Sequence, residues 1–234
     1  MDLLPNIFII LLAALIHASL QLGPGCLLLL CRHSLSTPKL RKSTTTLTVG
    51  FILGAVFITT TLLAAACYFL FIIFQQNQPP LVVTAIASGV VVGLAGVLPF
   101  IYYRPTGTAL WIPRTTANFL ESRTAKTSNP TESFSLGIMS VLGEAPITLV
   151  LIAIASYSIL ELTTSWQLLT IVIYAIIATI PLTSTALALR FGSNISRIQR
   201  WRESNKTFFR IILAVGFFTL GAYIFVFKGL PVGI

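Results

Sequence analysis

The sequence predicts an all-α integral membrane protein with six transmembrane helices, and its composition and charge distribution carry that prediction. Of the 234 residues, 56% are hydrophobic and 9% are charged, whereas soluble domains carry roughly 25% charged residues. Fourteen of the fifteen Lys and Arg residues fall into three short stretches that alternate with long apolar runs. This balance excludes a soluble domain, and membrane topology explains the net charge of +9 without a nucleic-acid partner.

Six apolar runs each supply the about 20 residues that a membrane-spanning helix needs. They extend over Leu3 to Cys31, Leu47 to Phe74, Leu81 to Tyr103, Phe134 to Leu160, Trp166 to Leu189 and Phe208 to Phe227. The first run begins within Met1 to Asn6, a leader that holds Asp2 but no Lys or Arg. A signal peptide starts with a positively charged region, so we expect this run to be a retained helix.

The basic stretches predict the orientation of the six helices. They follow the first, third and fifth runs, so the positive-inside rule places these three connections in the cytoplasm. Because six crossings return the chain to the side on which it started, Met1 and Ile234 are both expected outside. On this interpretation Lys228 is the single basic residue on the outer side.

The predicted helices divide into two halves of three. Residues 1–103 are expected to form a first three-helix repeat, residues 104–133 a cytoplasmic connection, and residues 134–234 a second three-helix repeat. Since each half has an odd number of helices, the halves run in opposite directions, and similarity between them implies a 3+3 inverted repeat. Leu22 to Leu27 (LGPGCL) can be laid over Leu142 to Ile147 (LGEAPI), which supports that repeat.

Glycine and proline interrupt three of the predicted helices. Gly23, Pro24 and Gly25 lie in the first run, Pro146 lies in the fourth and Pro181 lies in the fifth. An interruption frees backbone groups that hydrocarbon cannot satisfy, so it is tolerated where protein or a polar cavity receives them. Paired interruptions in two halves point to a central binding site. The sequence therefore predicts breaks around such a site, and a simple packing kink is the alternative.

Glu144 is the one acidic residue deep within an apolar run. It lies about 15 Å from the inner end of the fourth helix, at 1.5 Å per residue. A charged side chain at that depth costs on the order of 2.5 to 3.5 kcal/mol, so such residues usually face a cavity or a partner. Ser140, Glu144 and Thr148 are spaced by four residues, which places them along one face of the helix.

His17 lies at a similar depth in the first helix, with Gln21 and Pro24 following at four and seven residues. We expect Glu144 and His17 to line one cavity, where Glu144 binds a cationic group or exchanges a proton and His17 tunes it. The alternative is a neutral Glu144 and a hydrogen-bonded His17 that hold the helices together.

Two stripes of small residues predict close helix packing. Gly50 and Gly54 lie one turn apart in the second run, and Gly89, Gly93 and Gly96 lie along the third. We expect these positions to contact other helices of the same molecule, and a homodimer is the alternative.

The sequence predicts no metal site, no cofactor and no enzyme active site. The soft ligands are His17, Cys26, Cys31, His33 and Cys67, and they form no strong metal-binding spacing. Two histidines and six acidic residues also assemble no catalytic motif.

The layout of the chain resembles the lysine exporter superfamily of small six-helix transporters. The resemblance rests on the 3+3 arrangement, the Gly23 to Gly25 interruption, and a closing pattern of Arg200 to Arg210 followed by Gly216 and Gly221. It implies secondary transport, most often export of amino acids or metal cations, with alternating access around breaks in the first and fourth helices.

The same superfamily includes the transmembrane thiol-disulfide carriers of cytochrome c biogenesis. In that branch a Pro-Cys element in the first helix is matched by another in the fourth. Here Cys26 follows the first interruption, but Gly143 to Pro146 contains no cysteine. A two-electron relay needs a dithiol, and the fourth helix supplies no second thiol. A thiol-disulfide carrier that uses Cys26 and a thioredoxin-like partner is therefore the alternative to the exporter.

We therefore expect a multi-pass secondary transporter in the cytoplasmic membrane of a bacterium or archaeon. It would export a small solute, an amino acid or a cation, in exchange for a proton or ion. The expected site residues are His17, Gln21, Gly23, Pro24, Gly25, Glu144, Pro146, Thr148 and Pro181.

Overall fold

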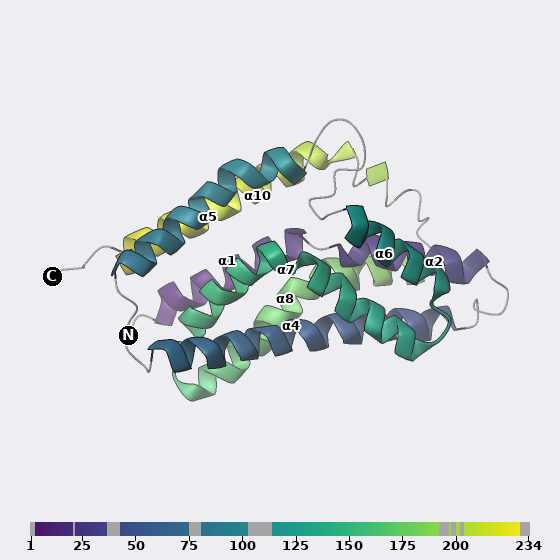
Figure 1. The fold of residues 1–234 in the computed structure, drawn as a ribbon, viewed down its shortest axis with the longest axis horizontal. Helices are drawn as coiled ribbons and strands as arrows, with labels where there is room; N and C mark the ends of the chain where they lie inside the picture. The colour runs from purple at the N-terminus through teal and green to yellow at the C-terminus, as the bar shows by residue number, and fades with distance from the viewer. Residues whose placement is uncertain are drawn as a thin grey trace.

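The structure, a computed structural model, describes residues 3–20, 22–36, 43–74, 81–102, 114–191, 197, 200–201 and 204–229. These residues are almost entirely helical (Figure 1). The elements in chain order are α1 (Leu3–Leu20), α2 (Gly23–Ser36), α4 (Thr44–Phe74), α5 (Leu81–Tyr102), α6 (Arg114–Lys126), α7 (Pro130–Leu160), α8 (Thr164–Arg190), α10 (Lys206–Ile224) and the π-helical turn η1 (Phe225–Gly229).

Within the described residues, six helical segments are long and apolar enough to cross a membrane. They are Leu3–Leu20, Thr44–Phe74, Leu81–Leu98, Pro130–Leu160, Thr164–Arg190 and Thr207–Lys228. Each overlaps one of the six apolar runs, so the prediction of an all-helical protein with six candidate spanning helices is confirmed. The chain is a multi-pass membrane protein.

The predicted interruptions behave differently in the structure. The first run is broken between Leu20 and Gly23, as expected, whereas α7 continues through Pro146 and α8 continues through Pro181. The predicted breaks in the fourth and fifth helices are therefore wrong. A single proline removes one backbone donor, which a membrane helix tolerates. In the first run, Gly23 and Gly25 on either side of Pro24 add two residues of low helix propensity, and α2 starts as a separate helix at Gly23.

The closest packing in the molecule joins α4 to α7, which run parallel. Ser133 Oγ donates to the carbonyl of Leu47 near the start of both helices, and Ser156 Oγ donates to Leu63 farther along. A Cβ atom at Gly54 would overlap the carbonyl oxygen of Phe134. The expected role of the Gly50 and Gly54 pair in packing within the molecule is confirmed.

The second glycine stripe does not pack. A Cβ atom at Gly89, Gly93 or Gly96 would meet no described atom within 4 Å, and these residues lie on the exposed face of α5. The expected contacts within the molecule at these positions are wrong. The reason is geometric, because α5 turns its opposite face, with Val91 and Leu98, toward the core.

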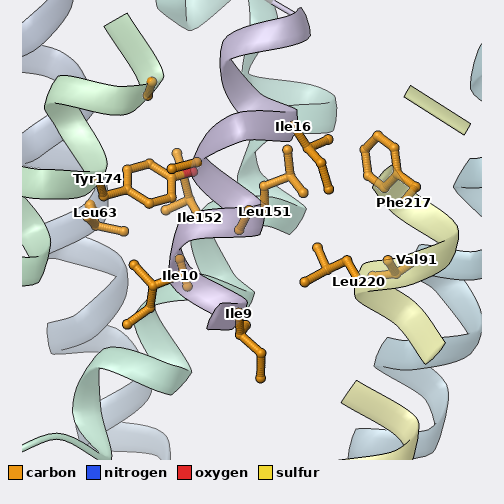
Figure 2. Close-up of a cluster of buried hydrophobic side chains, with 14 of the residues drawn as sticks. Ile9, Ile10, Ile16, Leu63, Val91, Leu151, Ile152, Tyr174, Phe217 and Leu220 are labelled. Carbon is orange, nitrogen blue, oxygen red and sulfur yellow. The ribbon is translucent and has the colours of Figure 1, made fainter. Parts of the chain in front are cut away.

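The six candidate spanning helices form a group of four, α1, α4, α7 and α8, and a pair, α5 and α10. Figure 1 shows α5 and α10 side by side, apart from α4, and α10 joins the pair to the rest of the molecule by packing against α1. In Figure 2, Ile9 and Ile16 of α1 lie between Tyr174 on one side and Phe217 on the other. Helix α1 is thus the centre of the larger hydrophobic core.

The predicted connection at 104–133 contains a helix that the sequence analysis did not anticipate. In α6, Leu120 and Thr124 are buried, and the helix packs against α2 and α7. Leu120 belongs to the smaller core cluster together with Leu27 and Val141. Helix α6 therefore covers the end of the molecule at which α2 lies.

Candidate functional site

The break between α1 and α2 exposes backbone donors inside the membrane. The carbonyl of Leu22 accepts hydrogen bonds from the N–H groups of Gly25 (2.9 Å) and Cys26 (3.2 Å), so Leu22 is the N-cap residue that directly precedes α2. Pro24 has no N–H group, and a proline in the first helical turn removes a donor that would be unpaired in any case. The N–H groups of Leu22 and Gly23 are left without a partner in their own helix.

Glu144 supplies that partner from α7. Its Oε1 atom accepts hydrogen bonds from the N–H of Leu22 and from the N–H of Gly23, the latter at 3.3 Å. The side chain is fully buried. The start of a helix carries a partial positive charge, so a carboxyl group is favourably placed there. Glu144 therefore caps a helix that belongs to a different part of the chain.

The second oxygen of Glu144 is available for another interaction. Oε2 is buried and has no hydrogen-bond partner among the described residues. Ser140 and Thr148, on the same face, are also fully buried, but their hydroxyl groups donate to carbonyls of their own helix, those of Gly137 and Glu144. The polar face of α7 is confirmed as an inward face.

His17 forms a second buried polar group, in α1. Its Nδ1 atom lies 3.0 Å from the hydroxyl oxygen of Tyr174 in α8, and both side chains are fully buried. Nε2 of His17 is buried without a partner in the described part of the chain. His17 precedes Leu22 by five residues, so this pair lies within about two helical turns of the break.

Tyr174 was missed by the sequence analysis. Tyrosine is common at the membrane interface, but Tyr174 lies in the middle of the apolar run from Trp166 to Leu189. That position, far from either end, is the signal that could have identified it as the partner of a buried polar group.

Gly23, Pro146 and Pro181, three further predicted site residues, lie at or near the break. Gly23 is close to α8 and α7, because a Cβ atom there would lie 3.5 Å from Leu182 Cδ1 and 3.8 Å from Ser140 Oγ. Pro181 directly precedes Leu182, and Pro146 follows Glu144 by two residues within the unbroken α7. Gln21 lies outside the described residues.

The cysteines do not form a disulfide. Cys26 is buried in α2, Cys31 lies in the same helix, and Cys67 lies in α4. Helix α7, which carries Glu144, contains no cysteine. In the part of the chain that the structure describes, no three His, Cys, Asp or Glu side chains are grouped to hold a metal ion.

Comparisons of this chain with protein-family models, with curated proteins and with solved structures found no match. The helices themselves are those of an apolar membrane protein with six candidate spans among the described residues.

Proposed function

We propose that this protein is a secondary transporter whose central site is formed by Glu144 and the break between α1 and α2. One observation carries the proposal. The fully buried carboxyl group of Glu144 binds the backbone amides at the break with one oxygen, and its other oxygen has no partner among the described residues. This leaves a position for a cationic group or a proton.

A purely structural role would not need an acid. Asn and Ser cap helix starts as effectively as acidic residues do, and a neutral side chain avoids the cost of placing an ionisable group in the membrane. The use of Glu at this position supports a function in which the group changes its charge or binds a cation. The proposal is that Glu144 alternates between a proton and a cationic part of the substrate.

The helix contacts support an inverted repeat and alternating access. In the proposed repeat, α1 corresponds to α7, α4 to α8 and α5 to α10. The contact between α1 and α8 then corresponds to the contact between α7 and α4, and both occur, while the pair of α5 and α10 corresponds to itself. The contact between α1 and α10 corresponds to the position between α7 and α5, where a cavity lies. Such a difference between halves is what a two-state transport cycle uses.

The direction and substrate class follow from the resemblance to the lysine exporter superfamily. We propose export of an amino acid or a cation from the cytoplasm, in exchange for a proton or another ion, across the cytoplasmic membrane of a bacterium or archaeon. The chain would act without a cofactor.

Transport in proteoliposomes tests this proposal. The purified protein would be reconstituted with a pH-sensitive dye inside the vesicles, and gradients of individual amino acids and divalent cations would be applied. We expect at least one of these solutes to drive proton movement through the wild-type protein and no movement above empty vesicles through Glu144→Gln.

Glu132→Gln is the matched control, because Glu132 lies on the same helix α7 but is exposed. It should transport as the wild type does. Equal transport by Glu144→Gln and the wild type, or no solute-driven proton movement with any member of the panel, contradicts the proposal.

A further inference from the structure

A cavity of about 200 Å³ lies away from Glu144, at the end of the molecule where α4 ends and α5 begins. Helices α1, α4, α5, α7 and α10 and the turn η1 contribute to its walls. The lining includes Ile9, Val83, Ala153, Tyr157, Ile224 and Lys228.

The cavity combines a buried floor with an exposed edge. Ile9 and Ile224 are buried, whereas Val83 is 43% exposed and Ala153 is also exposed. In a membrane, the exposed residues of a spanning helix face lipid. Apolar cavities of about 150 Å³ stay dry and take up small hydrocarbons. A hydrocarbon chain entering from the bilayer is therefore the occupant that this lining fits.

Two opposite charges lie at the mouth of the cavity. The ammonium group of Lys228 forms an ion pair with the carboxylate of Glu161, and both side chains retain just under a fifth of their exposure. Lys228 Nζ also lies 5.7 Å from the ring centroid of Tyr157, which lines the cavity. Lysine and tyrosine are typical of the level of the lipid headgroups.

The carboxylate of this pair has an unfavourable local position. Glu161 is the residue that ends α7, and the end of a helix carries a partial negative charge. Cations are stabilised there, so Lys228 offsets part of the repulsion, and a second cation at the same place would offset more. Lys228 has three N–H donors and forms one ion pair with Glu161, so it can also contact an anionic group, while Glu161 can contact a cationic one.

We propose that this cavity binds one acyl chain of a phosphatidylethanolamine molecule, whose phosphate contacts Lys228 and whose ammonium group contacts Glu161. An anionic lipid such as phosphatidylglycerol would offer Glu161 no cation. Phosphatidylcholine carries both charges, but its quaternary ammonium group has no N–H to donate to a carboxylate. The proposal does not depend on transport, because none of the residues of the central site lines this cavity.

Native mass spectrometry of the delipidated protein tests the proposal. The protein would be titrated with phosphatidylethanolamine, phosphatidylcholine and phosphatidylglycerol that carry identical acyl chains. We expect one phosphatidylethanolamine to bind about five-fold more tightly than either other lipid, the ratio that one partly exposed ion pair supplies. Equal affinity for the three lipids overturns the proposal.

Two charge variants test the headgroup contacts. Glu161→Gln should shift the preference toward phosphatidylglycerol, because it removes the carboxylate and leaves Lys228 for a phosphate. Lys228→Gln should weaken binding of both phosphatidylethanolamine and phosphatidylglycerol. Lys126→Gln on α6, at the other end of the molecule, is the control and should bind as the wild type does. An unchanged lipid preference in Glu161→Gln overturns the proposed headgroup contacts.

A filling variant tests the acyl-chain position. Ala153→Phe places a ring in the cavity from its exposed edge and should abolish the tight binding of one lipid. Its thermal unfolding shows whether the variant is folded, and the charge variants remain informative if it is not. Retention of the tightly bound lipid by a folded Ala153→Phe protein, or a dimer mass without bound lipid, overturns the proposal.

Discussion

The segments Leu22 to Leu27 and Leu142 to Ile147 both begin with Leu-Gly, but they lie at different places in their helices. The first segment contains the start of α2, directly after the break that follows α1, whereas the second lies inside the continuous helix α7. The two segments nevertheless meet, because Glu144 of the continuous helix accepts the N–H groups of Leu22 and Gly23 at the break. The comparison shows a division of roles, in which one half supplies free backbone donors and the other supplies the acid that binds them.

Replacing Glu144 by leucine should remove the acceptor at the break and cause the largest loss of stability. The buried N–H group of Gly23 and the half-buried N–H group of Leu22 would lose their acceptor, and a buried donor left unpaired costs about 1 to 3 kcal/mol. We expect Glu144→Leu to lower the free energy of unfolding by about 2 to 4 kcal/mol, measured by denaturation in mixed micelles.

Glu144→Gln separates capping from charge in the same measurement. The amide oxygen of glutamine can still accept both hydrogen bonds, so its stability should stay within about 1 kcal/mol of the wild type, while proton-coupled transport is lost. A leucine variant as stable as the wild type would show that the two amides do not depend on Glu144.

The position of Glu144 relative to the break depends on how closely α7 approaches α4. A Cβ atom at Gly137, two turns before Glu144, would overlap the carbonyl oxygen of Phe51. Gly137→Ala should therefore separate the two helices and lower the free energy of unfolding by about 2 kcal/mol, the typical cost of overpacking. The measurement is again denaturation in mixed micelles.

Gly93→Ala is the matched substitution on α5, where an added Cβ atom meets no described atom within 4 Å. Alanine is a better helix former than glycine, so this variant should be as stable as the wild type or slightly more stable. Equal losses of stability in the two variants would mean that close contact between α4 and α7 is not what distinguishes Gly137.

The sequence predicts the membrane helices well because apolar length and charge position are local properties. The six runs, the inward face of Ser140, Glu144 and Thr148, and the break at Gly23 all follow from residue types and spacing. The partners of these groups do not follow, since they come from distant parts of the chain. Nothing near Glu144 in the sequence indicates the amides of Leu22 and Gly23.

Packing direction is also set by the whole fold. Gly50 and Gly93 both belong to stripes of small residues, yet Gly50 faces α7 and Gly93 faces away from the core. The stripe indicates that a close approach is allowed, and the arrangement of the other helices decides whether it occurs. The same holds for Tyr174, whose contact with His17 requires α8 to pack against α1.

Pro24 and Pro146 lie at different positions in their helices, and replacing them should change stability the least. Pro24 lies in the first turn of α2, where its missing N–H costs little, whereas Pro146 lies inside α7 and removes a hydrogen bond. Pro146→Ala restores that bond and should raise the free energy of unfolding by about 1 kcal/mol, less than in a soluble helix because membrane helices accommodate proline. Pro24→Ala should leave stability unchanged. If Pro24→Ala were instead the stabilising substitution, an N–H group at position 24 would find an acceptor at the break. The amides of Leu22 and Gly23 would then not be the only donors that the break can use to bind Glu144.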